Sequence, residues 1–461
     1  MLISDTVLCQ QTIVYKRTIV WYNYSILEGG EKSMKLSQKV YVSLSHKQKR
    51  IFDELTWHAT KLYNISNYEF RENEYISYGK NDKICKLNWH SDYLHAHNRQ
   101  QILRKLDKDW KSFFKAIEGF WKNPKKYTGR PKKPGFKNLE TRLGEVIFTK
   151  PGITQTHTKK NNPEGNLLIL SLAKKMQSKY QVKNIKLKLT EKVLRLIGDL
   201  KNINQVIIKK DYYSGQYYLN VVYTKKENKK EVENYTNIMS IDLGLDNLAT
   251  LAFLENKETY IIDGKVVKSR RKYFDKEISY LQSIRMKQTG SKYFTDTKKI
   301  KSLRKNDKDY QLNYLHHAAK DIIELAKKHE VRSIVVGDMR NIKKGMKNNK
   351  SFVRGPIQKL KKLIEYKALL EGINYIEQNE AYTSGCSALD LESIDKKSYN
   401  KKRRITRGLF RSNKDYLINA DVNGSLNILR KYLKLKCIPK LIQSAMDNGV
   451  VDAPKRISVA C

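Results

Sequence analysis

Residues 239–250 read MSIDLGLDNLAT, and they are the best single guide to the architecture of this chain. Ile241 and Leu243 flank Asp242, so a strand here would bury two apolar side chains on one face and present a carboxylate on the other. Gly244 leaves room for another backbone or a ligand to approach closely. The segment predicts a strand that carries an acidic residue into a site.

Residues 418–428 read INADVNGSLNI and predict a helix. Val422, Leu426 and Leu429 follow one another at i, i+4 and i+7, which leaves Asp421 in the first turn and off the apolar stripe. A glycine inside a helix costs about 1 kcal/mol relative to alanine. We therefore expect a neighbouring group to pack closely against Gly424.

Asp242 and Asp421 together are typical of enzymes that cut phosphodiester bonds with two divalent ions, because ions about 4 Å apart need carboxylates from different elements. Each aspartate alone is also explained by structure, as a turn residue or as an acidic residue at a helix N-terminus. Two candidates follow for a third acid. Asp338 ends the predicted strand in IVVGDM, residues 334–339, and Glu380 ends a predicted strand over 373–378.

The composition favours a nucleic-acid partner. The 461 residues carry 91 Lys and Arg against 47 Asp and Glu, a formal net charge of +44.

Five scattered cysteines without a CxxC pair exclude a disulfide framework and indicate a reducing compartment. No apolar run approaches the roughly 18 residues of a membrane span, and the N-terminus does not resemble a signal peptide. We expect a cytoplasmic, nucleoid-associated protein with no membrane partner.

Pattern and charge predict a multidomain α/β protein. Residues 1–33 are balanced in charge, so we expect them to be dispensable, with translation starting at Met34. The order three strands, helix, strand, helix, strand, helix, which begins at about residue 238, is that of a ribonuclease H-like fold. The remaining segments are a small β-barrel (34–45 and 138–224), an inserted helical lobe (46–137), a linker (225–237), the α/β nuclease domain (238–381 and 414–432), an insertion (382–413) and a C-terminal tail (433–461).

Two basic segments are predicted to contact nucleic acid, although a charge run is most often a solvated surface. The loop 122–137 holds seven basic residues and no acid, and the run 396–411 holds eight, with Leu409 and Phe410 as apolar anchors. The predicted contacts are Lys122, Lys125, Lys126, Arg130, Lys132, Lys133, Lys401, Lys402, Arg403, Arg404 and Arg407.

Four ordered segments resemble the TnpB (OrfB) family of insertion-sequence proteins, which are relatives of the Fanzors and of type V CRISPR nucleases. They are IDLGLDNLAT (241–250), IVVGDM (334–339), residues 355–384 and RGLFRSNKDYLINADVNGSLNILRK (407–431). The resemblance implies an RNA-guided DNA endonuclease with a RuvC-type nuclease domain, a wedge-like β-barrel and a helical recognition lobe. It implies Mg²⁺ or Mn²⁺ as cofactor. The implied partners are a guide RNA from the protein's own transposon and double-stranded target DNA, in a monomeric ribonucleoprotein.

Two departures from the family pattern matter. The commonest pattern has Glu where this chain has Gly337, and only Cys386 remains of a four-cysteine zinc ribbon. A one-residue step along a strand reverses the direction of the side chain, so we expect Glu380, rather than Asp338, to join Asp242 and Asp421 as a metal ligand. A zinc site needs four ligands, so we expect no zinc.

Two other functions are considered. The glycine at position 337 permits a nuclease-dead, RNA-guided DNA-binding repressor derived from the same family. A transposase that joins strands itself is less well supported, because no tyrosine-nucleophile motif with a paired-histidine metal site is evident.

Overall fold

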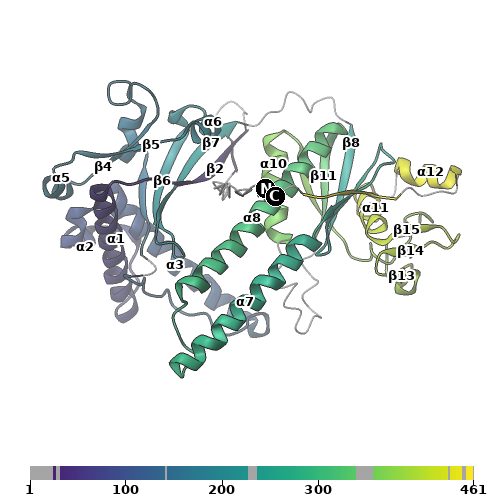
Figure 1. Cartoon of the computed structure of the whole chain (residues 1–461), viewed down its shortest axis with the longest axis horizontal. Helices are drawn as coiled ribbons and strands as arrows, with labels where there is room; N and C mark the ends of the chain where they lie inside the picture. The colour runs from purple at the N-terminus through teal and green to yellow at the C-terminus, as the bar shows by residue number, and fades with distance from the viewer. Residues whose placement is uncertain are drawn as a thin grey trace, which may run out of the picture. The chain divides into compact units, whose positions relative to one another are not determined.

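The computed structural model describes residues 24–26, 32–140, 143–226, 236–338, 357–434, 437–448 and 453–459 (Figure 1). The chain forms two compact units, unit 1 over Met1–Lys225 and unit 2 over Lys226–Cys461. Most of the predicted linker, residues 227–235, lies outside the described residues. Among the helices that are described, none is long and apolar enough to cross a membrane.

Unit 1 contains two sheets. The first has the strand order β1-β2-β7-β6-β3 and the second pairs β4 with β5. The strands are β1 (Tyr24–Ile26), β2 (Lys32–Tyr41), β3 (Val146–Thr149), β4 (Leu167–Ser171), β5 (Asn184–Lys188), β6 (Ile203–Lys210) and β7 (Tyr217–Lys226). The described pairings leave these two sheets separate, so closure into a barrel stays a prediction.

The start of the first sheet falls within the segment predicted to be dispensable. β1 pairs antiparallel with β2 through Tyr24 and Met34. Ser33 and Met34 are both fully buried. The dispensability of 1–33 stays a prediction, and most of that segment lies outside the described residues.

Helices follow β2 over the segment for which a helical lobe was predicted, and the assignment of this segment as a separate lobe stays a prediction. Its helices are α1 (His46–Glu72), α2 (Tyr78–Lys86), η1 (Trp89–Tyr93), α3 (Ala96–Lys122) and η2 (Pro124–Lys126). Ser45 and Gln48 form a capping box that begins α1. Short helices follow between the later strands: α4 (Lys150–Ile153), η3 (Thr154–His157), α5 (Lys174–Tyr180), α6 (Glu191–Ile197) and η4 (Leu200–Asn202).

A buried histidine pair links α1 to η1. Nδ1 of His58 lies 2.9 Å from Nδ1 of His90, an arrangement that needs one ring to accept a hydrogen bond and so to be neutral. Burial lowers the pKa of His90 to about 4, with repulsion from His58 and Lys61 adding to it. Burial also lowers the pKa of His58, against the attraction of Glu54.

We expect the thermal unfolding midpoint to fall as pH drops from about 6.5 to 4. The unfolded chain takes up protons on these histidines at a higher pH than the folded chain, so the stability that they contribute is full above 6.5 and is lost below it. His90→Gln should reduce this acid sensitivity when melting is followed from pH 7.5 to 4.5. An unchanged pH profile in the variant would contradict the assignment.

Unit 2 is built on a six-stranded sheet with the order β12-β11-β8-β9-β10-β16. The strands are β8 (Asn237–Leu243), β9 (Asn247–Phe253), β10 (Tyr260–Asp263), β11 (Val331–Asp338), β12 (Asn374–Asn379) and β16 (Lys455–Ile457). β8, β9 and β10 are antiparallel neighbours, whereas β11 pairs parallel with both β8 and β12. Apart from β16, the strands follow one another along the chain in the predicted order, and the ribonuclease H-like assignment stays a prediction.

Helices cover both faces of this sheet (Figure 1). They are α8 (Lys298–Lys328), α10 (Ile357–Leu370) and α11 (Ala420–Tyr432), whereas α7 (Lys265–Thr289) packs against α8. α8 and α10 lie on one face, and α11 lies on the other, where it crosses β8 and β9. The sheet therefore presents alternate side chains of β8 and β11 to α11.

The insertion and the C-terminal segment add further elements. The insertion contains η6 (Lys401–Arg403), β13 (Arg404–Thr406) and β14 (Leu409–Arg411), and β14 pairs with β15 (Leu417–Asn419). The segment predicted only as a tail contains α12 (Lys440–Asn448) and β16, which pairs parallel with β10. Part of the predicted tail is thus the edge of the unit 2 sheet.

Candidate active site

The direction of the Asp242 side chain is set by the alternation of side chains along β8. Helix α11 packs closely against this side chain, because the residue of α11 at the contact is a glycine, Gly424. Ile241 and Leu243 are buried, as predicted for the opposite face. A Cβ atom added to Gly424 of α11 would lie 2.6 Å from Oδ2 of Asp242. This confirms the close packing expected at Gly424, and it means that the backbone of α11 rests on the carboxylate.

Asp421 lies in the first turn of α11, as predicted. The Asn419 side chain caps the helix by accepting from the backbone N–H groups of Asp421 and Val422. Two side chains hold the Asp421 carboxylate from outside the helix: Asn247 donates to Oδ2 at 2.6 Å, and Arg404 donates to Oδ1 at 2.7 Å.

Glu380 reaches the same region from the end of β12. Val336 is paired with Ile241 in the parallel register of β11 and β8, so Gly337 comes beside Asp242 on the face toward α11. A Cβ atom at Gly337 would lie 2.6 Å from Oε2 of Glu380 and 2.9 Å from Cδ1 of Ile428. The Glu380 carboxylate therefore fills the space that a side chain at position 337 would need.

Asp338 points away from α11. Its Oδ1 lies 3.5 Å from Nζ of Lys361, a buried lysine of α10 that also pairs with Glu377 at 3.0 Å. The one-residue step from Gly337 to Asp338 moves the side chain to the α10 face. The structure thus brings Asp242, Glu380 and Asp421 toward one face and places the Asp338 carboxylate on the other.

The carboxylates repel one another. Burial raises the pKa of Asp242 well above its usual value, and the charges of Glu380 and Asp421 raise it further. Burial raises the pKa of Glu380 to about 7, with Asp338 contributing and Lys361 opposing. Such a group of desolvated acids is stabilised by positive charge.

A cavity of about 500 Å³ opens beside Asp242 and Asp421. Its wall includes residues that the sequence analysis did not single out, among them Asp246, Asn247, Lys265 and Arg456. Asp246 is held by Lys268 at 2.5 Å and by Arg407 at 2.6 Å. Asp246 and Asn247 lie inside the quoted 239–250 motif, whereas no pattern marked Arg456 of β16.

The donor set suits a hard divalent cation. Asp242, Glu380 and Asp421 offer carboxylate oxygens, the ligands that Mg²⁺ and Mn²⁺ prefer. Two of the three have raised pKa values. Within the described part of the chain, however, no three His, Cys, Asp or Glu side chains already converge closely enough to hold one ion. A cation would therefore have to draw the three carboxylates together.

The insertion is organised around Glu392. Its carboxylate accepts two hydrogen bonds from Arg403 at 2.7 Å, one from the Ser387 backbone N–H at 2.9 Å and one from Asn413 at 2.8 Å. Its carbonyl accepts from Arg430 of α11 at 2.8 Å. Glu392 thus engages the Arg403 guanidinium, and the nucleic-acid contact predicted for Arg403 stays a prediction.

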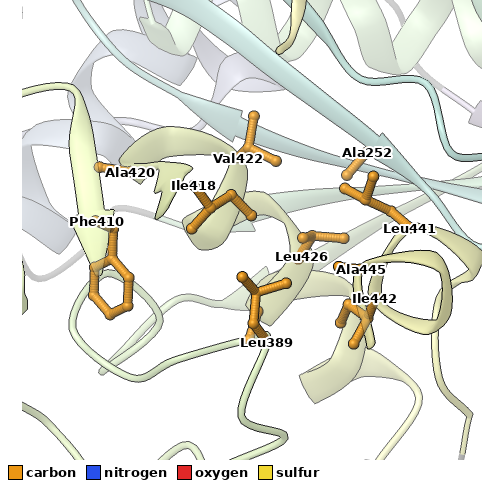
Figure 2. Packing of buried hydrophobic residues seen from close by; sticks show 11 residues of the cluster. Ala252, Leu389, Phe410, Ile418, Ala420, Val422, Leu426, Leu441, Ile442 and Ala445 are labelled. Atoms are coloured by element: carbon orange, nitrogen blue, oxygen red, sulfur yellow. The ribbon is translucent and has the colours of Figure 1, made fainter. Parts of the chain in front are cut away.

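Apolar contacts join the insertion to α11 and α12 (Figure 2). The predicted anchor Phe410 is fully buried and Leu389 nearly so, whereas Leu409 is only half-buried. Cys386 is buried, and its carbonyl accepts hydrogen bonds from Asn423 and Asn427. The cluster comprises Ala252, Ala388, Leu389, Phe410, Ile418, Ala420, Val422, Leu426, Leu441, Ile442 and Ala445.

We expect Glu392→Gln to loosen the insertion by about 2–3 kcal/mol, because breaking a largely buried pair leaves the arginine unmatched. Hydrogen exchange over residues 382–413 should report this loss. Asp415→Asn, which removes an exposed pair with Arg411, should change exchange little.

Metal analysis should find no zinc, and EDTA should not alter hydrogen exchange over residues 382–413 in the wild type. One zinc per chain, lost in Cys386→Ser, would contradict this.

The other predicted nucleic-acid contacts are exposed. They include Lys122, Lys125, Lys126, Arg130, Lys132, Lys133, Lys401 and Lys402, together with Arg407, which pairs with Asp246. Arg404 is exposed but reaches Asp421. Nucleic-acid binding by these residues stays a prediction.

Comparison with known proteins agrees with the resemblance. Residues 220–343 match the OrfB_IS605 family, described as a probable transposase, and residues 358–428 match the Cas12f1-like TNB domain. The TnpB-like protein ORF457 of Acidianus two-tailed virus is 26% identical over 416 residues, covering 83% of this chain and 84% of that protein. These matches confirm the predicted resemblance to the TnpB family. The family is related to the type V nucleases.

Two further proteins that the chain resembles are Cas12 proteins. The CRISPR-associated endodeoxyribonuclease Cas12f2 of a Micrarchaeota archaeon is 27% identical over 250 residues, 49% of this chain and 42% of that protein. The chain therefore matches less than half the length of this relative. The fold is similar to that of Cas12f1 in a complex with single-guide RNA and target DNA, with a TM-score of 0.52, 16% identity and coverage of 84% and 83%.

Proposed function

We propose that this protein is an RNA-guided endonuclease that cuts double-stranded DNA in the cavity beside Asp242. The observation that supports this most directly is the approach of Asp242, Glu380 and Asp421 from three elements toward one face of the sheet. The formal net charge of +44 suits two nucleic-acid partners. A guide RNA would select the target by base pairing, and the protein would hold the heteroduplex by its backbone.

Asp242, Glu380 and Asp421 would hold the divalent ions. When bound, Mg²⁺ or Mn²⁺ would activate water for attack on the phosphate and stabilise the leaving 3′-oxygen. Asn247 and Arg404 fix the orientation of the Asp421 carboxylate. Arg404 is itself held by the Arg407 carbonyl at 3.0 Å. The Arg404 guanidinium, which lies in the cavity wall, would bind a non-bridging oxygen of the DNA phosphate.

The test is to purify the protein from cells that express its flanking transposon sequence and to identify the RNA that copurifies. The complex should cut DNA that matches one end of this RNA with Mg²⁺ or Mn²⁺ and not with EDTA. Specific DNA binding without cutting, across metals and targets, would instead indicate the repressor. A protein that carries no RNA and shows no guided binding would reject both functions.

A further inference from the structure

We infer that a lysine-lined cavity in unit 1 binds a phosphate group of a nucleic-acid backbone, with Lys137 as the main contact. The inference rests on the proposed function only in assuming a nucleic-acid partner. The cavity lies far along the chain from the carboxylates of unit 2, and its role does not depend on cleavage.

The cavity has a volume of about 300 Å³ and a strongly basic wall. It is formed by α1, α3, β3, β6, β7 and the segment that follows the basic loop. The charged and polar side chains of the wall include Tyr63, Lys105, Lys137, Glu145, Lys209 and Lys210. Four ammonium groups thus surround a space with room for a phosphate and part of its sugar.

Three of the four lysines have carboxylate partners. Glu145 pairs with Lys209 at 2.5 Å and with Lys105 at 3.5 Å. Lys210 pairs with Asp53 at 2.8 Å. Among the described residues, no carboxylate makes an ion pair with Lys137, whose ammonium lies 4.8 Å from the centre of the Tyr63 ring. Lys137 is therefore the lysine of this wall that makes no ion pair among the described residues.

The surroundings of Lys137 favour an incoming anion. Burial lowers the pKa of Lys137, repulsion from Lys105 and Lys209 lowers it further, and attraction from Asp109 and Glu145 opposes the charges of these two lysines. A phosphate would offset both the lost hydration and the repulsion, because its oxygens accept charge-assisted hydrogen bonds from several ammonium groups.

The site is built before any ligand arrives. The Asn64 side chain of α1 makes two hydrogen bonds to the backbone of Lys137: it accepts one from the N–H at 2.7 Å and donates one to the carbonyl at 2.9 Å. The Gly144 N–H donates to Oγ1 of Thr60 at 2.7 Å. A Cβ atom at Gly144 would lie 3.3 Å from the Thr60 backbone nitrogen, so glycine permits this close contact. Both segments that carry the wall are thus fixed to one helix.

The basic loop leads into this cavity. Its Pro134 carbonyl accepts hydrogen bonds from Asn67 at 3.0 Å and Arg71 at 2.8 Å, so the loop lies along α1 up to Lys137. Exposed lysines and arginines precede the cavity along the loop. A polymer of phosphates matches this series of cations better than a single small anion does.

The experiment compares Lys137→Gln with Lys137→Arg and with Lys188→Gln, which removes an exposed lysine of β5 outside the cavity. One arm measures the affinity of the protein for guide RNA. The other measures binding of target duplex by the preassembled RNA complex in EDTA. Both follow the dissociation constant over a KCl series, and thermal melting checks that each variant is folded.

In one of the two arms, Lys137→Gln should weaken binding roughly tenfold and reduce the slope of log Kd against log salt by about 0.9. That arm identifies RNA or DNA as the source of the phosphate. Lys137→Arg should retain most of the affinity, and Lys188→Gln should match the wild type. If Lys137→Gln proves unstable, Lys105→Gln on the facing wall should show the same loss.

Equal binding by Lys137→Gln and the wild type in both arms would overturn the inference, as would an equal loss in Lys188→Gln. Either result would leave the proposed nuclease standing, because cleavage is not measured. Failure of the wild type to bind either nucleic acid would overturn the proposed function together with the inference.

Discussion

Asp242→Asn should lower DNA cleavage by about a thousandfold or more while RNA binding and target binding change less than about twofold. Asparagine keeps the shape of the side chain but removes the charge that holds a cation, and metal ions contribute several kcal/mol to such reactions. Single-turnover cleavage and duplex binding in EDTA would measure the two effects separately. Loss of binding together with cleavage would show that Asp242 supports the fold rather than the chemistry.

Asp296→Asn provides the matched control for Asp242→Asn. Asp296 pairs with Arg304 beside α8 in the same unit, so its substitution removes one ion-paired aspartate. Cleavage by this variant should stay within about twofold of the wild type. A comparable loss in both variants would indicate a general effect of charge in unit 2.

Glu380→Gln should lower cleavage by roughly a hundredfold or more, whereas Asp338→Asn should retain it within a few-fold. The Glu380 carboxylate lies against Gly337 on the face toward α11, and Asp338 lies beside Lys361 on the opposite face. Asp338→Asn removes a negative charge beside the buried Lys361, so this variant should unfold at a lower temperature than the wild type. Activity retained by the first variant and lost in the second would reverse the two roles.

Restoring the commoner family pattern gives a sharper test of Glu380. A glutamate introduced at position 337 would displace the Glu380 carboxylate, because a Cβ atom there would lie 2.6 Å from it. The double variant Gly337→Glu with Glu380→Gly should therefore recover part of the cleavage that Glu380→Gln loses. Gly337→Glu alone should be impaired. If the double variant is no better than Glu380→Gln, the two positions do not supply the same ligand.

Much of unit 2 could be predicted because its signals are local. The alternation around Asp242 and the helical spacing after Asp421 fix which way each carboxylate points. Gly424 was expected to face a close neighbour, and that neighbour is Asp242 itself. The sequence of strands and helices also followed from the length and hydrophobicity of each segment.

Features that depend on distant contacts could not be predicted. Glu392 stands between two other acids, Asp390 and Asp395, without a distinctive spacing, so its role as the acceptor for Arg403 emerges only in three dimensions. β16 has three residues, too few for a periodic pattern, although it brings Arg456 to the cavity. Lys137 was recognised as part of a basic loop, but its cavity depends on Asn64 and Thr60 of another element.

The contact between Gly337 and Glu380 constrains how the site can change over generations. A form that carries glutamate at both positions has to displace the Glu380 carboxylate, because a Cβ atom at position 337 would lie 2.6 Å from it. We therefore expect a lineage that moves its third acid from one strand end to the next to lose the old glutamate before or as the new one appears.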